Sequence, residues 1–222
     1  MDEKSLQQLA AQLRQPHGEA GIQMGEWMNR GNVHINLDTL SILNAVAGDN
    51  ILEIGMGNGF FVHHIVEKDT SIHYTGADFS ELMITEAKRI NAGWIAKGQV
   101  QFVLSNAGNL AFDNNSFNKI FTINTIYFWE DAVKILGDVK RLLQPGGKFI
   151  ITLRPKRQMK NYPFTKYGFT MYTKEETEQL LSENGFSTIR SHEIREPDYE
   201  VHGEMVQMES LIIEATKNNT HS

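Results

Sequence analysis

Residues 51–62, which read ILEIGMGNGFFV, contain the feature that most constrains how this chain can fold. A short apolar segment includes Glu53, and Gly55, Gly57 and Gly59 follow at alternate positions before an apolar segment resumes. Glycine lacks Cβ, so the backbone can turn sharply there and a ligand can lie against it. A helix that starts at such a turn presents unpaired N–H groups to the ligand. The pattern therefore predicts a strand, a ligand-binding turn and a helix.

The rest of the chain alternates between β-type and helical segments. We expect strands at 50–54, 72–77, 100–104, 119–123 and 148–153, and helices at 59–67, 80–97, 130–143 and 173–185. Strands that alternate with helices predict a parallel sheet with helices on both faces. Two further β-type segments, 186–194 and 210–215, are separated by an acidic loop without a helical pattern. They are therefore expected to form an antiparallel pair that closes the sheet.

About 47 residues precede the first strand. Apolar residues at helical spacing predict a helix at 2–14, and a second helix is expected from Asn36 or Asp38 to about residue 47. The intervening glycine-rich and asparagine-rich segment is expected to be a loop that folds over the ligand site. We interpret residues 1–222 as one domain, with 1–47 as a helical cover, 48–216 as the ligand-binding core and 154–172, rich in aromatic residues, as a lid insertion.

Composition excludes several classes of function. The chain has no cysteine, which excludes disulfides, cysteine-based zinc sites and thiol nucleophiles, and we expect no metal site. Its 21 basic and 27 acidic side chains give a net charge of −6, without the basic footprint of a nucleic-acid-binding protein. No apolar run approaches the roughly 18 residues that span a bilayer. We expect a cytoplasmic protein with a small-molecule partner, not a nucleic acid or a membrane; the oligomeric state stays open.

Several motifs in this order resemble those of class I S-adenosylmethionine-dependent methyltransferases. They are the glycine-rich turn with Glu53, the Pro145-Gly146-Gly147 turn ahead of the fifth strand, and the segment 110–118 between the third and fourth strands. The resemblance covers about residues 36–216 and fits the small-molecule, methyltransferase type 11-like branch. It implies a Rossmann-like, doubly wound α/β fold with a mostly parallel seven-stranded sheet and an antiparallel C-terminal strand. It also implies methyl transfer from S-adenosyl-L-methionine to a small molecule.

The resemblance assigns cofactor contacts by position. Asp78 stands 19 residues beyond Gly59 at the end of the second strand, where an acid can accept hydrogen bonds from both ribose hydroxyls. The other assigned contacts lie on the glycine-rich turn and after the next three strands. Gly55, Met56, Gly57 and Gly59 would pass beneath the methionine and ribose, Glu53 would hold water or the ammonium group, Phe79 and Met83 would flank the adenine, Asn106 and Ala107 would lie at its amino group, and Asn124 would line the methionine end.

The catalytic group is less sharply indicated. A sulfonium methyl is already electrophilic, so methyl transfer needs mainly alignment and desolvation, with a base for a poor nucleophile. His34, in the expected loop, could orient the acceptor or take its proton, although an isolated loop histidine also fits a plain surface position. Tyr127, after the fourth strand, could pack against the sulfonium or the acceptor, or belong to the core. These two residues are the catalytic candidates.

Two alternative functions stay open at this point. The chain could be a cofactor-binding subunit without catalytic activity, since a fold does not determine a function. It could also be a short-chain dehydrogenase, because Ser105–Gly108 and the Tyr162/Lys166 spacing match motifs of that family. Pro163 argues against the dehydrogenase, since its Tyr and Lys must share one helical face and proline disrupts a helix interior. The sequence leaves open which molecule is methylated, and whether at O, N, C or S.

Overall fold

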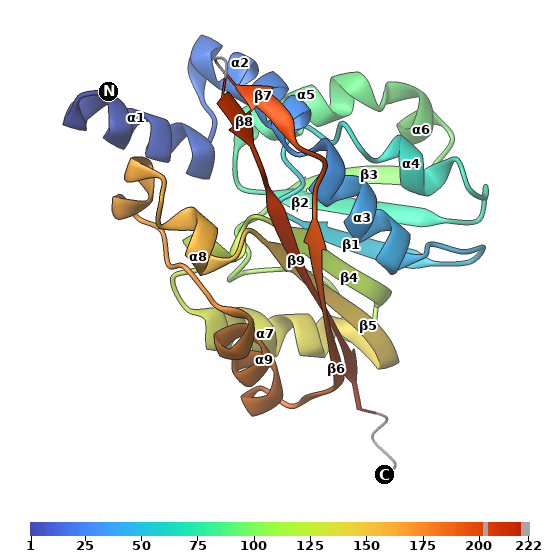
Figure 1. Ribbon diagram of the computed structural model, residues 1–222. Helices are drawn as coiled ribbons and strands as arrows, with labels where there is room; N and C mark the ends of the chain where they lie inside the picture. The colour runs from blue at the N-terminus through green and yellow to red at the C-terminus, as the bar shows by residue number, and fades with distance from the viewer. Residues whose placement is uncertain (202–203, 219–222) are drawn as a thin grey trace.

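The computed structural model describes residues 1–201 and 204–218, and its centre is a seven-stranded sheet (Figure 1). The strands lie in the order β3-β2-β1-β4-β5-β9-β6. Their bounds are β1 Asn50–Ile54, β2 His73–Asp78, β3 Val100–Leu104, β4 Phe117–Ile123, β5 Leu143–Leu153, β6 Phe186–Arg195 and β9 Glu209–Lys217. Neighbouring strands from β3 to β5 pair in parallel, and β9 pairs antiparallel with both β5 and β6. The predicted doubly wound fold with an antiparallel C-terminal strand is confirmed.

Two apolar cores lie on the two faces of this sheet. Because side chains alternate along a strand, Ile51 packs into one core and Leu52 into the other. The first core includes residues of α3 (Val33–Leu43), α4 (His63–Val66) and α5 (Glu81–Ile90). The second includes residues of α7 (Ala132–Leu142) and α9 (Lys174–Glu183). Both faces are therefore covered, and the carboxyl edge of the parallel strands is left for a ligand.

The prediction of a loop over the ligand site is wrong for most of that segment, because residues 18–31 form the helix α2. Helix α1 spans Glu3–Arg14 as predicted, and α2 spans Gly18–Gly31. A Cβ on Gly21 would lie 2.7 Å from Leu82 Cδ2 and 2.9 Å from the carbonyl carbon of Pro16, so α2 packs directly on α5. The glycines lower helix propensity by about 1 kcal/mol each, and this close packing overrides that preference.

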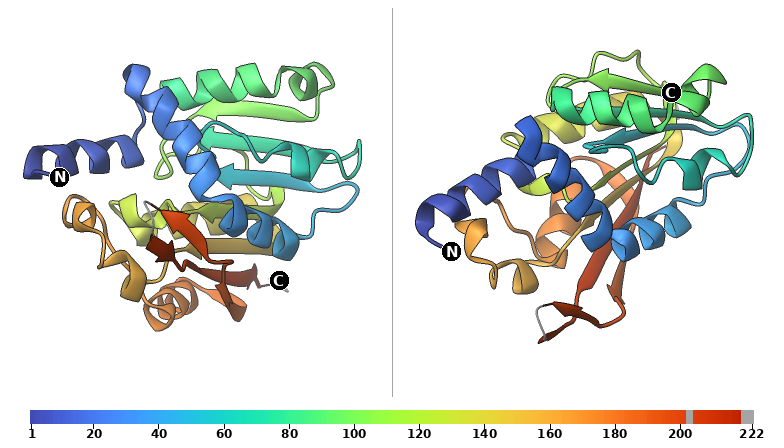
Figure 2. Two further views of the ribbon diagram at one scale, coloured as in Figure 1. Left: turned by 45° about the horizontal axis from the view of Figure 1, so that its top comes forward. Right: turned by 90° about the horizontal axis from the view of Figure 1, so that it is seen from above.

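Helix α3 begins earlier than predicted, at Val33 instead of Asn36, and it ends at Leu43 instead of near residue 47. Asn44, at φ 47°, terminates it in the left-handed conformation. The shift changes which side chains face the sheet: Ile35 and Thr39 are buried, whereas Leu37 is exposed. In Figure 2, α1 and α2 lie beside the carboxyl ends of the parallel strands, and α3 continues from them over one face of the sheet.

Three other helices depart from the expected bounds. Only His63–Val66 of the predicted 59–67 helix is α-helical. The predicted 80–97 helix starts as expected with Ser80 as N-cap, but it breaks at Asn91 into α5 and α6 (Ala92–Ala96). Asn91 donates from Nδ2 to the carbonyl oxygen of Gly59, which ties this break to the glycine-rich turn. Helix α7 is confirmed near its predicted place, two residues later at its start.

The C-terminal third confirms the predicted capping box and antiparallel pair. Thr173 Oγ1 accepts from the Glu176 N–H and Glu176 Oε2 accepts from the Thr173 N–H, at the start of α9. The expected acidic loop between β6 and β9 carries a small hairpin, β7 Tyr199–Val201 and β8 Glu204–Val206; its residues 202–203 lie outside the described part. No helix in the described ranges is long and apolar enough to cross a membrane.

Candidate functional site

A cavity of about 460 Å³ lies at the carboxyl edge of the parallel strands, beneath the N-terminal helices. Ligand cavities in proteins fall in the same range of volumes. Its walls come from the ends of β1, β2 and β4, from the segments that follow β3 and β4, and from α1, α2 and α3. Of the predicted cofactor contacts, the lining includes Glu53, Gly55, Met56, Gly57, Asp78, Phe79, Met83, Asn106, Ala107 and Asn124.

The three glycines of the turn have left-handed backbones but different surroundings. Gly55 is at φ 75°, and a Cβ there would overlap Thr125 Cγ2, so the β1 and β4 ends approach as closely as glycine allows. Gly57 is at φ 60°, and no atom lies within 4 Å of the point that a Cβ would occupy, which leaves its backbone open to the cavity. Gly59 instead packs against Asn91 and does not line the cavity, so it supports the turn from behind.

Two carboxyl groups face the cavity beside this turn. Asp78 is 7% exposed, and its two oxygens accept the N–H groups of Gly57 at 3.0 Å and Ser80 at 2.9 Å. Burial raises the pKa of Asp78 to about 6, although these backbone hydrogen bonds oppose the shift. Glu53 accepts from the Tyr74 hydroxyl at 2.5 Å, and burial raises the pKa of Glu53 to about 7. Near neutral pH both groups can therefore exchange a proton when a ligand binds.

The predicted adenine-side residues gather at one end of the cavity. Phe79, directly after β2, and the buried Met83 of α5 flank it, and Asn106 and Ala107 line it after β3. Asn106 Oδ1 already accepts the N–H of Gly108 at 3.0 Å. A carbonyl oxygen has two lone pairs, so one acceptor position on Asn106 is left for a ligand amino group.

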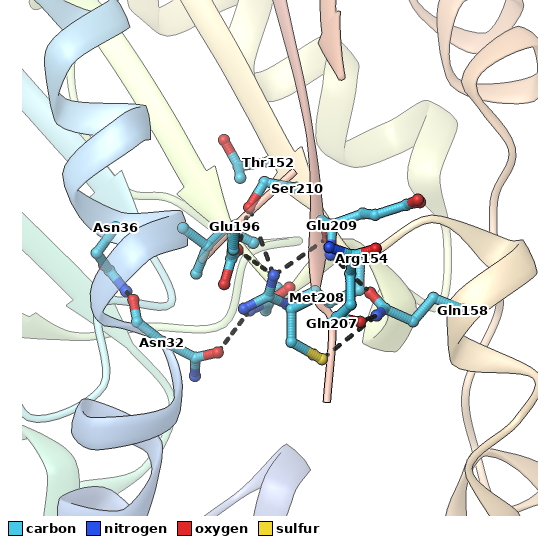
Figure 3. A network of polar contacts seen from close by, with 12 residues as sticks. Asn32, Asn36, Thr152, Arg154, Gln158, Glu196, Gln207, Met208, Glu209 and Ser210 are labelled. Carbon is cyan, nitrogen blue, oxygen red and sulfur yellow. Dashed lines mark hydrogen bonds and ion pairs between the residues drawn. The ribbon is translucent and has the colours of Figure 1, made fainter. Parts of the chain in front are cut away.

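The opposite end of the cavity is lined by amide side chains, several of which sequence reasoning placed in a loop. Asn124, at φ 56° after β4, donates from Nδ2 to Asn32 Oδ1 at 3.4 Å, and Asn36 Nδ2 donates to the Asn32 carbonyl oxygen at 2.7 Å (Figure 3). Asn29 also lines the cavity. Gly21, Gly25, Asn29, Asn32 and Asn36 recur at spacings of three and four, which is the helical signal that could have revealed this face.

Neither of the two predicted catalytic residues lines the cavity. His34 lies in α3, exposed and outside the cavity lining, because the helix starts three residues earlier than expected and turns Asn36 inward in its place. Tyr127 is buried and does not line the cavity. Its hydroxyl donates to Asn124 Oδ1 at 3.0 Å and accepts the Arg154 N–H at 2.5 Å, while burial raises its pKa. Tyr127 thus fixes the orientation of Asn124.

The aromatic segment 154–172 packs against the core instead of standing free. It contains α8 (Lys156–Met159) and a 3₁₀ turn at Pro163–Lys166. Phe169 contacts Phe128, with ring centroids 4.7 Å apart, and Phe128 lines the cavity. Tyr162 and Lys166 do not share a helix, so the geometry that a short-chain dehydrogenase requires is absent from this segment.

Comparison with known proteins agrees with this fold. The uncharacterized methyltransferase YdaC of Bacillus subtilis is 29% identical over 133 residues, 60% of this chain and 71% of YdaC. A chain in the complex between the Haloferax volcanii Trm112 methyltransferase activator and the putative methyltransferase superposes with TM-score 0.77 at 15% identity, covering 95% of this chain and 97% of that chain.

Phosphoethanolamine N-methyltransferase 2 of Haemonchus contortus, solved with phosphomonomethylethanolamine and S-adenosylhomocysteine, superposes with TM-score 0.71 at 18% identity. That match covers 96% of this chain and 60% of the Haemonchus chain. A family model described as a methyltransferase domain matches residues 45–185, which is more than half of the chain. The chain therefore belongs to the methyltransferase family, whose members take S-adenosylmethionine as cofactor.

Proposed function

We propose that this protein transfers the methyl group of S-adenosylmethionine to a small-molecule acceptor that enters the same cavity. The observation that carries the proposal is the meeting of the open Gly57 backbone, the Asp78 carboxylate and the amide-lined wall around Asn124 in one cavity of about 460 Å³. A cofactor and a compact acceptor can share a volume of this size. Whole macromolecules could present only a protruding group to it.

The residues around the turn fit the cofactor. Asp78 uses one acceptor position on each oxygen for backbone N–H groups, and a carboxylate has about four such positions, so two hydroxyl donors can still be bound. Gly57 leaves room for a ligand against its backbone. Glu53, once ionised, offers a negative charge to an ammonium group, and Phe79 with Met83 offers an apolar slot for a flat base. S-adenosylmethionine, when bound, supplies an electrophilic methyl group.

The helical cover supplies the remaining requirement, which is exclusion of water from the reacting atoms. Leu13 and Arg14 of α1 line the cavity, and Arg14 Nη2 contacts Glu130 Oε1 at 2.7 Å across it. The Pro16 carbonyl accepts the Ser80 hydroxyl at 2.6 Å, which anchors the α1–α2 junction to the start of α5. Alignment between Asn124 and this cover, in a desolvated cavity, is sufficient for a reaction with an already activated methyl donor.

Two observations support a small-molecule acceptor. The net charge of −6 gives no general attraction to nucleic acid. The Haemonchus relative was solved with phosphomonomethylethanolamine, a small molecule. The cytoplasmic location predicted from the sequence forms part of the proposal, as does a lid role for residues 154–172, and cell fractionation tests the former.

Calorimetry with S-adenosylhomocysteine and transfer of labelled methyl from S-adenosylmethionine to a metabolite panel test the proposed function. Asp78→Ala is expected to abolish measurable cofactor binding, whereas Asp113→Ala, an exposed acid after β3, serves as the matched control and should bind normally. Cofactor binding without transfer to any acceptor would favour a non-catalytic subunit. Absence of heat with folded wild-type protein would contradict the proposal itself.

A further inference from the structure

A hydroxyl group buried inside the sheet holds one of the two carboxyl groups of the cavity. Tyr74 of β2 is 1% exposed and does not line the cavity, and its hydroxyl donates to Glu53 Oε2 at 2.5 Å. In the parallel register Glu53 lies opposite Gly76, and Tyr74 stands two residues before Gly76 on the same face of β2. The pairing of β1 with β2 therefore brings the hydroxyl to the carboxyl group.

The ring of Tyr74 is fixed by its surroundings. It belongs to the core that includes residues of α3, α4 and α5, and it meets Phe102 of β3 edge-on, with ring centroids 6.2 Å apart. A Cβ on Gly76 would lie 2.9 Å from Phe102 Cδ1, so glycine at that position lets Phe102 pack this close to β2. Burial and the neighbouring Glu53 raise the pKa of Tyr74 well above its ordinary value, so its hydroxyl stays protonated and stays a donor.

The bond from Tyr74 leaves the second oxygen of Glu53 for a ligand. Every buried side-chain oxygen of the described residues has a hydrogen-bond partner, whereas Glu53 Oε1 has none among them. Oε1 is therefore not buried, and because Glu53 lines the cavity, a ligand there can reach this atom. Hydroxyl bonds to an ionised carboxylate are short, about 2.5–2.7 Å, and roughly twice as strong as neutral ones. The Tyr74 bond thus stabilises the ionised form of Glu53, with Oε1 open to the cavity.

The charges around Glu53 favour a cation at Oε1. Burial raises the pKa of Glu53 to about 7, the Tyr74 hydrogen bond opposes this rise, and the charge of Asp78 adds to it. Helices α2 and α3 contribute uncharged amides to the lining, and the remaining charged side chains of the cavity lie in α1, in α7 and directly before α7: Arg14, Lys134, Glu130 and Asp131. Arg14 is already paired with Glu130. Glu53 itself has no ion-pair partner in the part of the chain that the structure describes, and the methionine end of S-adenosylmethionine carries an ammonium group.

We propose that Tyr74 is a positioning residue for the cofactor: by donating to Oε2, it holds the Glu53 carboxylate with Oε1 toward the ammonium group of S-adenosylmethionine. This inference rests on the proposed function, in which the cofactor occupies this cavity. Tyr74 acts through Glu53 and does not touch the ligand. Its loss should therefore weaken only those ligands that carry the ammonium group.

Tyr74→Phe tests this selectivity, because it removes the hydroxyl and keeps the buried ring. Calorimetry at pH 7.5 compares S-adenosylhomocysteine, which carries the ammonium group, with 5′-methylthioadenosine, which keeps the adenosine and the sulfur but lacks the amino-acid part. We expect the Kd for S-adenosylhomocysteine to rise about tenfold, as for the loss of a hydrogen bond to a charged group. The Kd for 5′-methylthioadenosine should match that of the wild type, which also shows that the variant is folded.

A double-mutant cycle with Glu53→Gln tests whether Tyr74 acts through Glu53. The glutamine side chain has no charge to direct at the ammonium group, so adding Tyr74→Phe should change the Kd for S-adenosylhomocysteine by less than about twofold. Asp113→Asn is the matched control, because Asp113 is exposed and outside the cavity lining, and Tyr74→Phe should keep its full effect beside it. In Tyr74→Phe alone, the ionised form of Glu53 loses a donor, so binding should begin to weaken at a higher pH than in the wild type.

Three results would overturn the inference. An equal loss of affinity for both ligands would give Tyr74 a purely structural role. Additive effects in the cycle, or a pH profile that does not move in Tyr74→Phe, would show that the hydroxyl does not act through Glu53. The heat of S-adenosylhomocysteine binding to the wild type tests the proposed function and is independent of these outcomes, so the inference can fail while the proposed function stands.

Discussion

Acidification should weaken cofactor binding by an amount that follows from the two carboxyl groups of the cavity. The pKa of Glu53 is raised to about 7 and that of Asp78 to about 6. If the cofactor binds only when both carboxyl groups are ionised, protonation of each group raises the apparent Kd by the factor 1 + 10^(pKa − pH). Between pH 7.5 and pH 5.5 this factor grows about 25-fold for Glu53 and about 4-fold for Asp78, giving roughly 100-fold in Kd.

A fall in pH changes the stability of the free protein and its cofactor affinity in opposite directions, so weaker binding at low pH can be told apart from unfolding. Both acids have folded-state pKa values above their unfolded ones, so the free protein binds these protons more tightly when folded. Their contribution to stability is therefore complete below about pH 4 and is lost as pH rises through 6 and 7. Over the assay range these two groups make the free protein more stable as the pH falls, while cofactor binding becomes weaker.

Calorimetry with S-adenosylhomocysteine at intervals of half a pH unit provides the assay. Glu53→Gln should lose the larger part of the pH dependence, about 25-fold, and keep the smaller part, whereas Asp113→Asn should follow the wild type. A Kd that stays constant from pH 7.5 to 5.5, or a Glu53→Gln profile that matches the wild type, would refute the assigned ionisation states.

Three further substitutions test the packing of the glycine-rich turn, the packing of α2 and the capping of α9. Gly55→Ala should lower the free energy of unfolding by about 1–3 kcal/mol and remove most of the cofactor affinity, because the new Cβ would overlap Thr125 in a left-handed backbone. Gly48→Ala is the control: at φ 81° and with no atom near its Cβ, it introduces the backbone strain without the steric contact. Gly21→Ala should loosen α2 from α5 and raise amide hydrogen exchange across α2, and unchanged exchange would contradict the close packing. Thr173→Ala should lower the thermal midpoint by removing a capping bond of about 1 kcal/mol, without changing cofactor affinity.

The sheet and its glycine-rich turn could be predicted because their signals are local. The bounds of β1 and β3 match the predicted strands, and Asp78 lines the cavity at the spacing that assigned it. Alternating apolar residues and adjacent glycines report directly on a strand and its turn. The predicted cofactor contacts are therefore mostly gathered in one place, with Gly59 as the exception.

The helical cover could not be predicted because its signals depend on partners distant in sequence. Gly21 disfavours a helix unless α5 packs against it, and no local rule contains that contact. Helix α3 starts three residues earlier than predicted, and as a result Asn36 lines the cavity whereas His34 is exposed. The role of Tyr127 is set by the backbone of Arg154, 27 residues away. In each of these three cases, burial and hydrogen-bond partners distant in sequence determine the structure.

The insertion of β9 between β5 and β6 has a consequence for biosynthesis. Residues 209–217 leave the ribosome after every other strand of the sheet, yet both β5 and β6 use them as their antiparallel neighbour. Until then β5 presents an unpaired edge in the nascent protein, and β6 has no place in the sheet. Unpaired edges favour aggregation, so the growing polypeptide is most dependent on chaperones just before its last strand is made.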